Sequence, residues 1–249
     1  MYYCCGLTDI GTVRENNEDS YLINKSAVSD GAVECEPELP FMVAVADGVA
    51  GEASGEVASR TALELAAQIN VSCRTDYAKK LLDIHRTLKK HGAVLGSVNM
   101  QTTFCGAAFN ENGTVNIINV GDSKLFRFRG GIIRQLSTDQ SLVQMLYEQG
   151  EITAREKRSH THRNVIFPVL GNVDEEPKID VTEIEGGIKQ GDIILICTDG
   201  LSDYLTKGEM EEALSLPCRL SRRLEKLIEL AKKNGSRDNI TVAAVSAII

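Results

Sequence analysis

Five short acidic motifs are spread along the chain, and each joins a carboxylate to a small or turn-forming residue. Most of them lie where an apolar run stops or starts. Carboxylates gathered from distant strand ends are the oxygen ligands that hard divalent cations prefer. The pattern therefore predicts metal-assisted hydrolysis that uses no protein nucleophile. The motifs are RENNEDS (residues 14–20), ADGVAG (46–51), STDQS (137–141), CTDGLSD (197–203) and SRDNIT (236–241).

Three of these carboxylates stand at the ends of strand-like runs. Asp47 and Asp199 each close an apolar run and are followed by glycine, and Asp238 stands just before a third run. A single Asp-Gly pair is typical of an ordinary turn, because both are common turn residues. Three carboxylates at three strand ends, however, can converge at one edge of a sandwich.

The first motif pairs a base with acids. Arg14 precedes Glu18 and Asp19 within RENNEDS. Two interpretations stay open on spacing alone. The segment is either a solvated loop, or it carries an arginine that binds a phosphate group through its planar guanidinium, beside acids that hold metal-bound water.

Length and composition favour a single globular domain over residues 1–249, because the chain has 43% hydrophobic residues and no Pro/Gly/Ser-rich linker. The net charge of −8 argues against nucleic acid and anionic membrane as partners. The seven cysteines follow no zinc or disulfide spacing, and no apolar run is long enough for a membrane span. We therefore expect a cytoplasmic protein with reduced thiols.

Hydrophobic periodicity predicts an α+β fold. Its elements follow the order strand, two helices, strand meander, mixed insert, strand, two helices, strand. This order fits a four-layer αββα sandwich, in which two antiparallel sheets are flanked by helix pairs. The predicted strands are 41–46, 103–110, 114–120, 124–129, 193–198 and 240–249, and the predicted helices are 52–70, 77–91 (ended by Gly92), 207–216 and 221–234.

In this order, the motifs resemble the bacterial type of the PP2C-like, metal-dependent serine/threonine protein phosphatases. The resemblance covers residues 6–249. It implies a β-sandwich flanked by helix pairs and the hydrolysis of phosphoserine and phosphothreonine in proteins. The matching segments are GTVRENNEDS, VAVADGVAGEASGEVAS, NVGDSKLFRFRGG, LSTDQSLV, HRNVIFPVLG, GDIILICTDGLSDYL and SRDNITV.

The resemblance also implies a metal site with two, or with a further ion three, Mn²⁺ or Mg²⁺ ions. By resemblance, Asp47 bridges two ions and the backbone carbonyl of Gly48 binds one of them. Asp199 and Asp238 bind the other ion.

Further residues have auxiliary roles by the same resemblance. Asp19 contributes directly or through water, with Glu18 beside it, and Asp139 helps Asp199 to hold a third ion. Arg14 matches the phosphate-binding arginine. Asp122, in NVGDSK, is interpreted as structural support.

Three positions depart from the family pattern. Val49 stands where eukaryotic members often carry a histidine proposed to protonate the leaving group. Lys124 replaces an arginine, and Gln140 replaces a frequent histidine. Residues 141–170 correspond to the variable flap beside the active site, and its candidates for contacting substrate are Arg158, His160, His162 and Arg163.

The resemblance implies phosphoprotein partners, which we expect to be targets of a serine/threonine kinase. Two alternatives remain open from the residues. The first is an inactive phosphoprotein-binding module of the same fold, which predicts lost metal ligands. The second is a hydrolase of small phosphoesters, since a metal site recognises the phosphate and not the group that carries it.

Overall fold

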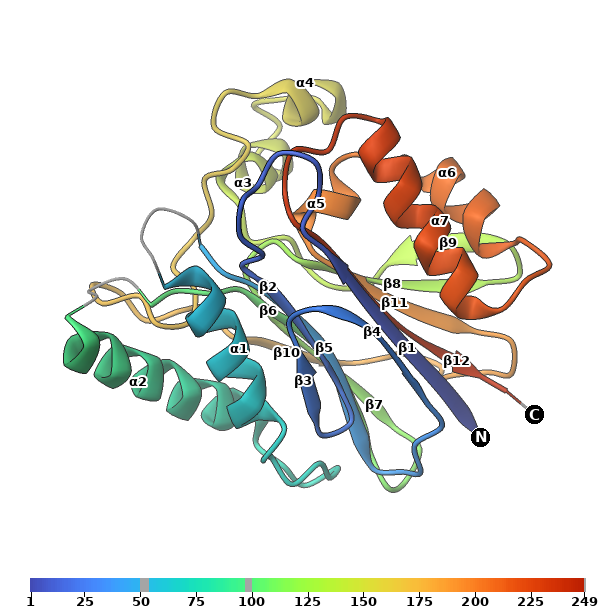
Figure 1. The fold of residues 1–249 in the computed structure, drawn as a ribbon, viewed down its shortest axis with the longest axis horizontal. Coiled ribbons are helices and arrows are strands. Elements are labelled where there is room, and N and C mark those ends of the chain that lie inside the picture. Colours follow the sequence, from blue (N-terminus) through green and yellow to red (C-terminus); the bar gives the residue numbers. More distant parts are fainter. Residues whose placement is uncertain (50–53, 97–99, 249) are drawn as a thin grey trace.

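Two six-stranded antiparallel sheets face each other in the computed structural model, which describes residues 1–49, 54–96 and 100–248 (Figure 1). The first sheet brings the two ends of the chain together, because β1 from the N-terminus and β12 from the C-terminus pair along their whole length. Its strands, in spatial order, are β4 (Gly31–Cys35), β1 (Tyr2–Asp9), β12 (Ile240–Ala247), β11 (Ile193–Cys197), β8 (Lys124–Arg129) and β9 (Ile132–Gln135).

The second sheet is built around three buried strands from the first half of the chain. All three have every residue buried or nearly so. Its strands, in spatial order, are β10 (Asp180–Glu183), β7 (Val115–Val120), β6 (Phe104–Phe109), β5 (Phe41–Asp47), β2 (Asp19–Ile23) and β3 (Ser26–Val28).

Helices cover the outer face of each sheet, which confirms the predicted four-layer αββα sandwich (Figure 1). Helices α1 (Gly55–Ala66) and α2 (Tyr77–Leu95) lie over the second sheet. Helices α5 (Asp199–Ser202), α6 (Lys207–Leu214) and α7 (Leu220–Lys233) lie over the first. Two short helices, α3 (Leu142–Glu148) and α4 (Ala154–Ser159), belong to the predicted flap and lie at one end of the sheets.

The alternation of side chains along the strands separates three apolar clusters. In β5, Val43 and Val45 point between the sheets, whereas Met42 and Ala44 point to α1 and α2. This is the expected result for a strand in a sheet covered on both faces, because successive side chains point to opposite faces. A fully buried aliphatic side chain of this kind contributes about 1.5–3 kcal/mol.

Two predicted helix ends are wrong. The helix predicted over 52–70 ends at Ala66. Helix α2 does not stop at Gly92 but continues to Leu95, and it ends where Gly96 adopts a left-handed φ of 68°. Gly92 is buried within the helix. A left-handed cap strongly favours a residue without a Cβ, and Gly96 supplies one four residues later. The predicted start of the first helix, Glu52, lies outside the described residues.

Over the described ranges, no helix is both long and apolar enough to cross a membrane.

Candidate active site

Four of the predicted carboxylates meet at the end of the sheets from which the β1–β2 loop leaves. Asp19 and Asp47 stand directly opposite each other on β2 and β5. Asp199 follows β11 and Asp238 precedes β12, and these two strands pair antiparallel. Burial raises the pKa of Asp47, and the charges of the other three acids raise it further. Side chains from four distant motifs therefore lie close enough for their charges to interact.

The backbone of Asp47 is fixed by the two residues that precede β6. Its N–H donates to the Thr103 hydroxyl at 3.0 Å, and its carbonyl accepts from Thr103 N–H at 2.8 Å and from the Thr102 hydroxyl at 2.9 Å. Three hydrogen bonds therefore hold the backbone of the residue that carries the carboxylate at the strand end.

In both Asp-Gly pairs, glycine is required because a side chain would not fit there, and not because the backbone adopts a turn conformation. A Cβ on Gly48 would lie 2.3 Å from the Gly55 carbonyl oxygen, and one on Gly200 would lie 1.9 Å from the Asn239 carbonyl oxygen. Neither glycine has a left-handed φ. Asp199 and Gly200 open the short helix α5 instead of forming a turn. The glycines therefore let α1 and α5 pack closely against the backbone beside the carboxylates.

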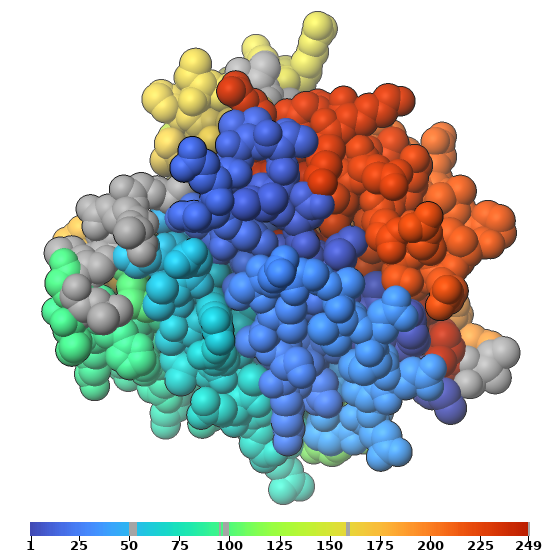
Figure 2. All heavy atoms as spheres, viewed as in Figure 1, coloured from blue at the N-terminus to red at the C-terminus, as the bar shows by residue number. Residues whose placement is uncertain are grey.

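Asn239 fastens the loop that carries Arg14. Its Oδ1 accepts from Glu18 N–H at 2.9 Å, and its Nδ2 donates to the carbonyls of Ile10 and Asn16 at 2.9 and 3.0 Å. Figure 2 shows the result, with the dark blue N-terminal segment lying against the red C-terminal one. No sequence pattern indicates this role, although Asn239 stands directly after a candidate ligand.

Asp19 is the most deeply buried acid of the group, with 1% of its surface exposed. Its Oδ2 accepts a hydrogen bond of 2.8 Å from the Thr198 hydroxyl. Burial raises the pKa of Asp19 to about 7, although hydrogen bonds from Thr241 and Thr198 act in the opposite direction. This strong desolvation is what a nearby cation would offset.

Asp122 also lies close to the acidic group, and the resemblance implies a supporting role for it. Burial raises the pKa of Asp199 to about 8, and the charge of Asp122 is the next largest cause. Burial raises the pKa of Asp122 itself to about 6, while Lys124 acts against this shift. The carboxylates thus destabilise one another's ionised forms.

Arg14 lies at the edge of the acids and contacts one of them. Its Nη2 is 2.8 Å from Oδ2 of Asp238, and the arginine side chain is 37% exposed. This hydrogen bond raises the pKa of Arg14, as do the charges of Glu18 and Asp47. Burial raises the pKa of Glu18, while Arg14 lowers it. The structure therefore places the arginine of the first motif beside the acid of the last.

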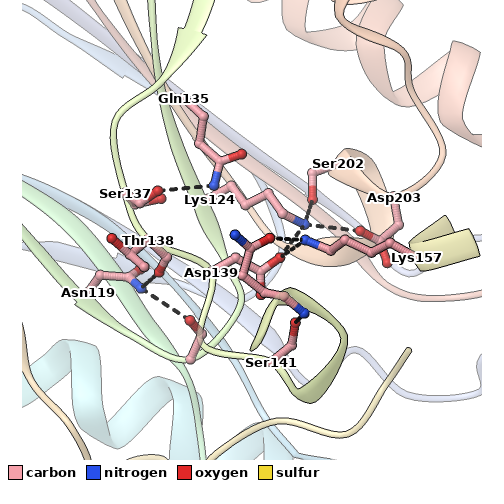
Figure 3. Close-up of polar contacts among 12 residues, drawn as sticks. Asn119, Lys124, Gln135, Ser137, Thr138, Asp139, Ser141, Lys157, Ser202 and Asp203 are labelled. Carbon is pink, nitrogen blue, oxygen red and sulfur yellow. Dashed lines mark hydrogen bonds and ion pairs between the residues drawn. The ribbon is translucent and has the colours of Figure 1, made fainter. Parts of the chain in front are cut away.

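Asp139 lies in a separate polar cluster with Lys124, Ser141 and Lys157 (Figure 3). Its charge raises the pKa of Asp122, which connects it with the acidic group. Burial alone would raise the pKa of Asp139, but Lys124, a hydrogen bond with Ser141 and Lys157 together lower it. Its Oδ1 is buried and has no hydrogen-bond partner among the described residues.

The flap candidates lie mainly on the surface. Arg163 stacks over the Tyr204 ring at 5.9 Å, and its Nη2 is 3.4 Å from the Tyr204 hydroxyl. The His160 and His162 rings are 5.6 Å apart. The side chain of Arg158 lies outside what the structure describes. Among the candidate side chains that the structure describes, Arg163 contacts the body of the protein at Tyr204.

Two of the three positions that depart from the family pattern have structural roles. Val49 packs against the apolar cluster under α1 and α2, so it offers no acid to a leaving group. Gln140 accepts from Gly121 N–H at 2.8 Å and donates to Asp180 at 2.9 Å, which ties its loop to β7 and β10.

The chemistry of the donor set fits a hard divalent cation. Among the described residues, no three Asp, Glu, His or Cys side chains are already arranged to hold one ion. Asp238 and Asp139 instead face the cations Arg14 and Lys157. The group nevertheless consists of carboxylates that raise one another's pKa, and Asp139 has an orphaned oxygen. Such a set gains most from an oxygen-preferring dication.

Comparisons with known proteins agree on one family. A sequence model described as protein phosphatase 2C matches residues 17–241. The serine/threonine phosphatase stp of Listeria innocua is 30% identical over 96% of this chain and 93% of its own length.

Solved structures give the same result. The serine/threonine phosphatase PstP/Ppp of Mycobacterium tuberculosis is 29% identical, with a TM-score of 0.80 and full coverage of both chains. A structure of the PstP catalytic domain in complex with two manganese ions is 27% identical, with a TM-score of 0.77 and full coverage of both chains.

Proposed function

The chain belongs to the protein phosphatase 2C family, and from this we propose that it hydrolyses phosphoserine and phosphothreonine in proteins with the help of divalent cations. The observation that carries the proposal is the meeting of Asp47, Asp199 and Asp238 beside Arg14 at one end of the sheets. Similar proteins that cover nearly the whole chain are named serine/threonine phosphatases.

We propose that the ions are Mn²⁺ or Mg²⁺, as a similar catalytic domain was solved with manganese. Asp47 and the Gly48 carbonyl, together with Asp199 and Asp238, would hold two ions, and Asp19 would support them from its buried position. When bound, the ions would polarise the phosphoryl group and supply a water of lowered pKa. The protein's own share is a fixed, desolvated frame of carboxylates, held by the hydrogen bonds on Asp47 and Asp19.

Arg14 is the group that would bind the phosphate of the substrate. Its pKa is raised, so the guanidinium stays charged, and it can form two parallel hydrogen bonds with phosphoryl oxygens. To do so it must exchange Asp238 for the substrate. An exposed ion pair of this kind is worth only about 0–1 kcal/mol, so the exchange costs little. Asn239 keeps the Arg14 loop in place throughout.

A cysteine nucleophile does not fit this site. Cys197, two residues before Asp199, is fully buried, and burial raises its pKa to about 12. Burial likewise raises the pKa of Cys105. Both therefore carry protonated, inaccessible thiols near neutral pH, whereas nucleophilic cysteines need an accessible thiolate. A water supplied by the bound ions would instead be the nucleophile, and no phosphoenzyme would form.

We further propose that the chain acts as one catalytic domain in the cytoplasm, on phosphoproteins made by a serine/threonine kinase. The support is the absence of a spanning helix over the described ranges and the names of the similar proteins. The acidic charge of −8 also disfavours nucleic acid as a partner.

A phosphopeptide assay tests this function. A phosphothreonine peptide is incubated with the protein in Mn²⁺, in EDTA, and in EDTA followed by excess Mn²⁺. We expect turnover, loss and recovery, in that order. A phosphotyrosine peptide and p-nitrophenyl phosphate serve as comparison substrates. Bound manganese without hydrolysis of any phosphopeptide would contradict the proposal, as would faster turnover of free phosphothreonine, which has the same leaving group, than of the phosphothreonine peptide.

A further inference from the structure

One threonine beside the acids uses its hydroxyl for a purpose other than the usual one at its position. Thr198 is fully buried and stands at the N-cap of α5, directly before Asp199. A threonine there ordinarily accepts a hydrogen bond from an N–H of the first helical turn. Among the described residues of α5, however, none donates to the Thr198 side chain. Its hydroxyl instead donates to Oδ2 of Asp19 on β2, at 2.8 Å.

Two other helices, α4 and α6, also begin after a threonine, and both show the usual arrangement. The Thr153 hydroxyl accepts from Glu156 N–H at 3.3 Å. The Thr206 hydroxyl accepts from Glu209 N–H, also at 3.3 Å. The backbone of Thr198, with φ of −75° and ψ of 170°, has nearly the same conformation as these two caps. The backbone of Thr198 therefore permits a cap, and only the hydroxyl is directed elsewhere.

The proton of the Thr198 hydroxyl has a defined direction. The hydroxyl oxygen accepts from Thr241 N–H at 3.1 Å, and a backbone N–H can only donate. The hydroxyl proton is therefore the one that lies between Thr198 and the Asp19 carboxylate. The backbone of Thr198 is fixed as well, because its N–H donates to the Thr241 carbonyl at 3.1 Å and its carbonyl accepts from Leu201 and Ser202 N–H at 3.2 Å.

This hydrogen bond crosses from one sheet to the other between the acids. Asp19 stands opposite Asp47 in the second sheet, whereas Thr198 links β11 of the first sheet to Asp199. The core between the sheets is otherwise an apolar cluster. Apolar contact has no preferred direction, but a hydrogen bond to a carboxylate restricts both distance and angle. The Thr198 hydroxyl is therefore suited to fix the place of Asp19 relative to Asp199.

We propose that Thr198 is a positioning residue, whose hydroxyl holds the Asp19 carboxylate in place relative to Asp199 so that the acids of both sheets serve the same divalent cations. This rests on the proposed function, which assigns these acids to the ions. Partners that orient a metal ligand typically contribute about 10–100-fold to metal affinity or activity. Phosphate binding should not depend on Thr198, because Arg14 lies on a separate loop that Asn239 holds.

The affinity of the whole protein for Mn²⁺, measured by electron paramagnetic resonance of the free ion, tests the proposal. Thr198→Val removes the hydroxyl and keeps the shape of the side chain, whereas Thr198→Ser keeps the hydroxyl and removes a methyl group. Thr206→Val is the matched control, because this threonine uses its hydroxyl to cap its own helix. Thermal unfolding in EDTA confirms that each variant folds.

We expect the dissociation constant for Mn²⁺ to rise about tenfold in Thr198→Val and to stay within about twofold of wild type in Thr198→Ser. Thr206→Val should keep the wild-type constant, although its lost cap lowers Tm by about 2–4 °C. With saturating Mn²⁺ and a phosphothreonine peptide, kcat of Thr198→Val should fall about tenfold while KM stays unchanged, because Arg14 is untouched.

An unchanged or lower dissociation constant in Thr198→Val would overturn the positioning role. Equal weakening in Thr198→Ser or in Thr206→Val would also overturn it, since lost packing or lost stability would then explain the effect. The proposed function fails separately. A wild-type protein that binds Mn²⁺ and hydrolyses no phosphopeptide would contradict that function, while the order of the dissociation constants would still decide the role of Thr198.

Discussion

Gly200 packs so closely on the start of β12 that one methyl group there should separate two candidate ligands. A Cβ on Gly200 would lie 1.9 Å from the Asn239 carbonyl oxygen, whereas ordinary contact begins at 3.4 Å. The oxygen belongs to the backbone, so no flexible side chain can yield. In Gly200→Ala, therefore, α5 and the segment before β12 must move apart. Asp199 and Asp238 adjoin the two clashing residues and would move with them.

Two magnitudes follow for Gly200→Ala. Overpacking of a tight contact costs about 1–3 kcal/mol, and for a chain of this size each kcal/mol lowers Tm by about 2–4 °C. A displacement of about 1 Å at reacting groups lowers the rate by about 100-fold. Thermal unfolding and kcat on a phosphothreonine peptide with Mn²⁺ measure the two effects.

Gly208→Ala is the matched control, because a Cβ there meets nothing within 4 Å on the exposed side of α6. Replacing a helical glycine by alanine should leave kcat unchanged and raise stability by about 0.5–1 kcal/mol. If Gly200→Ala matches Gly208→Ala in both Tm and kcat, the close packing does not position the ligands and the reasoning is wrong.

Three further predictions concern the same site. Asn239→Ala should lower stability by about 2–4 kcal/mol, since it removes three hydrogen bonds to the Arg14 loop at about 1 kcal/mol each; an unchanged denaturation midpoint would contradict this. Arg14→Met should raise KM for a phosphopeptide about tenfold with little change in Tm, because its ion pair is exposed while its phosphate contact is not replaced; an unaltered KM would remove Arg14 from phosphate binding. In EDTA, burial holds the pKa of Asp19 at about 7 and that of Asp199 at about 8, above the ordinary value of 3.8. Between these values the folded chain keeps protons that the unfolded chain has lost. The free energy of unfolding should therefore fall as pH rises from about 4 to about 8. Unfolding scans across that range check the sign, and rising stability would contradict it.

The site could be predicted from sequence where its residues adjoin strongly apolar strands. Asp47 and Asp199 each close a run of buried residues, so their positions at strand ends follow from the pattern alone. The proximity of Arg14 to Asp238 could be expected only from the resemblance, because 224 residues separate them. Pattern and family together thus identify the carboxylates and the arginine.

The rest depends on tertiary contacts that leave no periodic signal. The sequence pattern does not predict strand β1, because Gly6 interrupts its apolar run. In the structure, Tyr21 packs where a Gly6 side chain would be. The contact between Lys157 and Asp139 joins a short helix to a loop, and neither has a pattern that points to the other. The role of Asn239 likewise depends on a loop from the opposite end of the chain.

The most direct test of the central claim compares Asp199→Asn with Asp83→Asn, which removes an exposed carboxylate on α2. Turnover of a phosphothreonine peptide is measured for both with Mn²⁺ and with EDTA. We predict that EDTA abolishes turnover and that Asp83→Asn behaves as wild type. Asp199→Asn should lose at least about 100-fold in rate, because a lost ligand removes several kcal/mol of charge stabilisation. Turnover that survives EDTA, or full activity in Asp199→Asn, would contradict hydrolysis assisted by ions at these carboxylates.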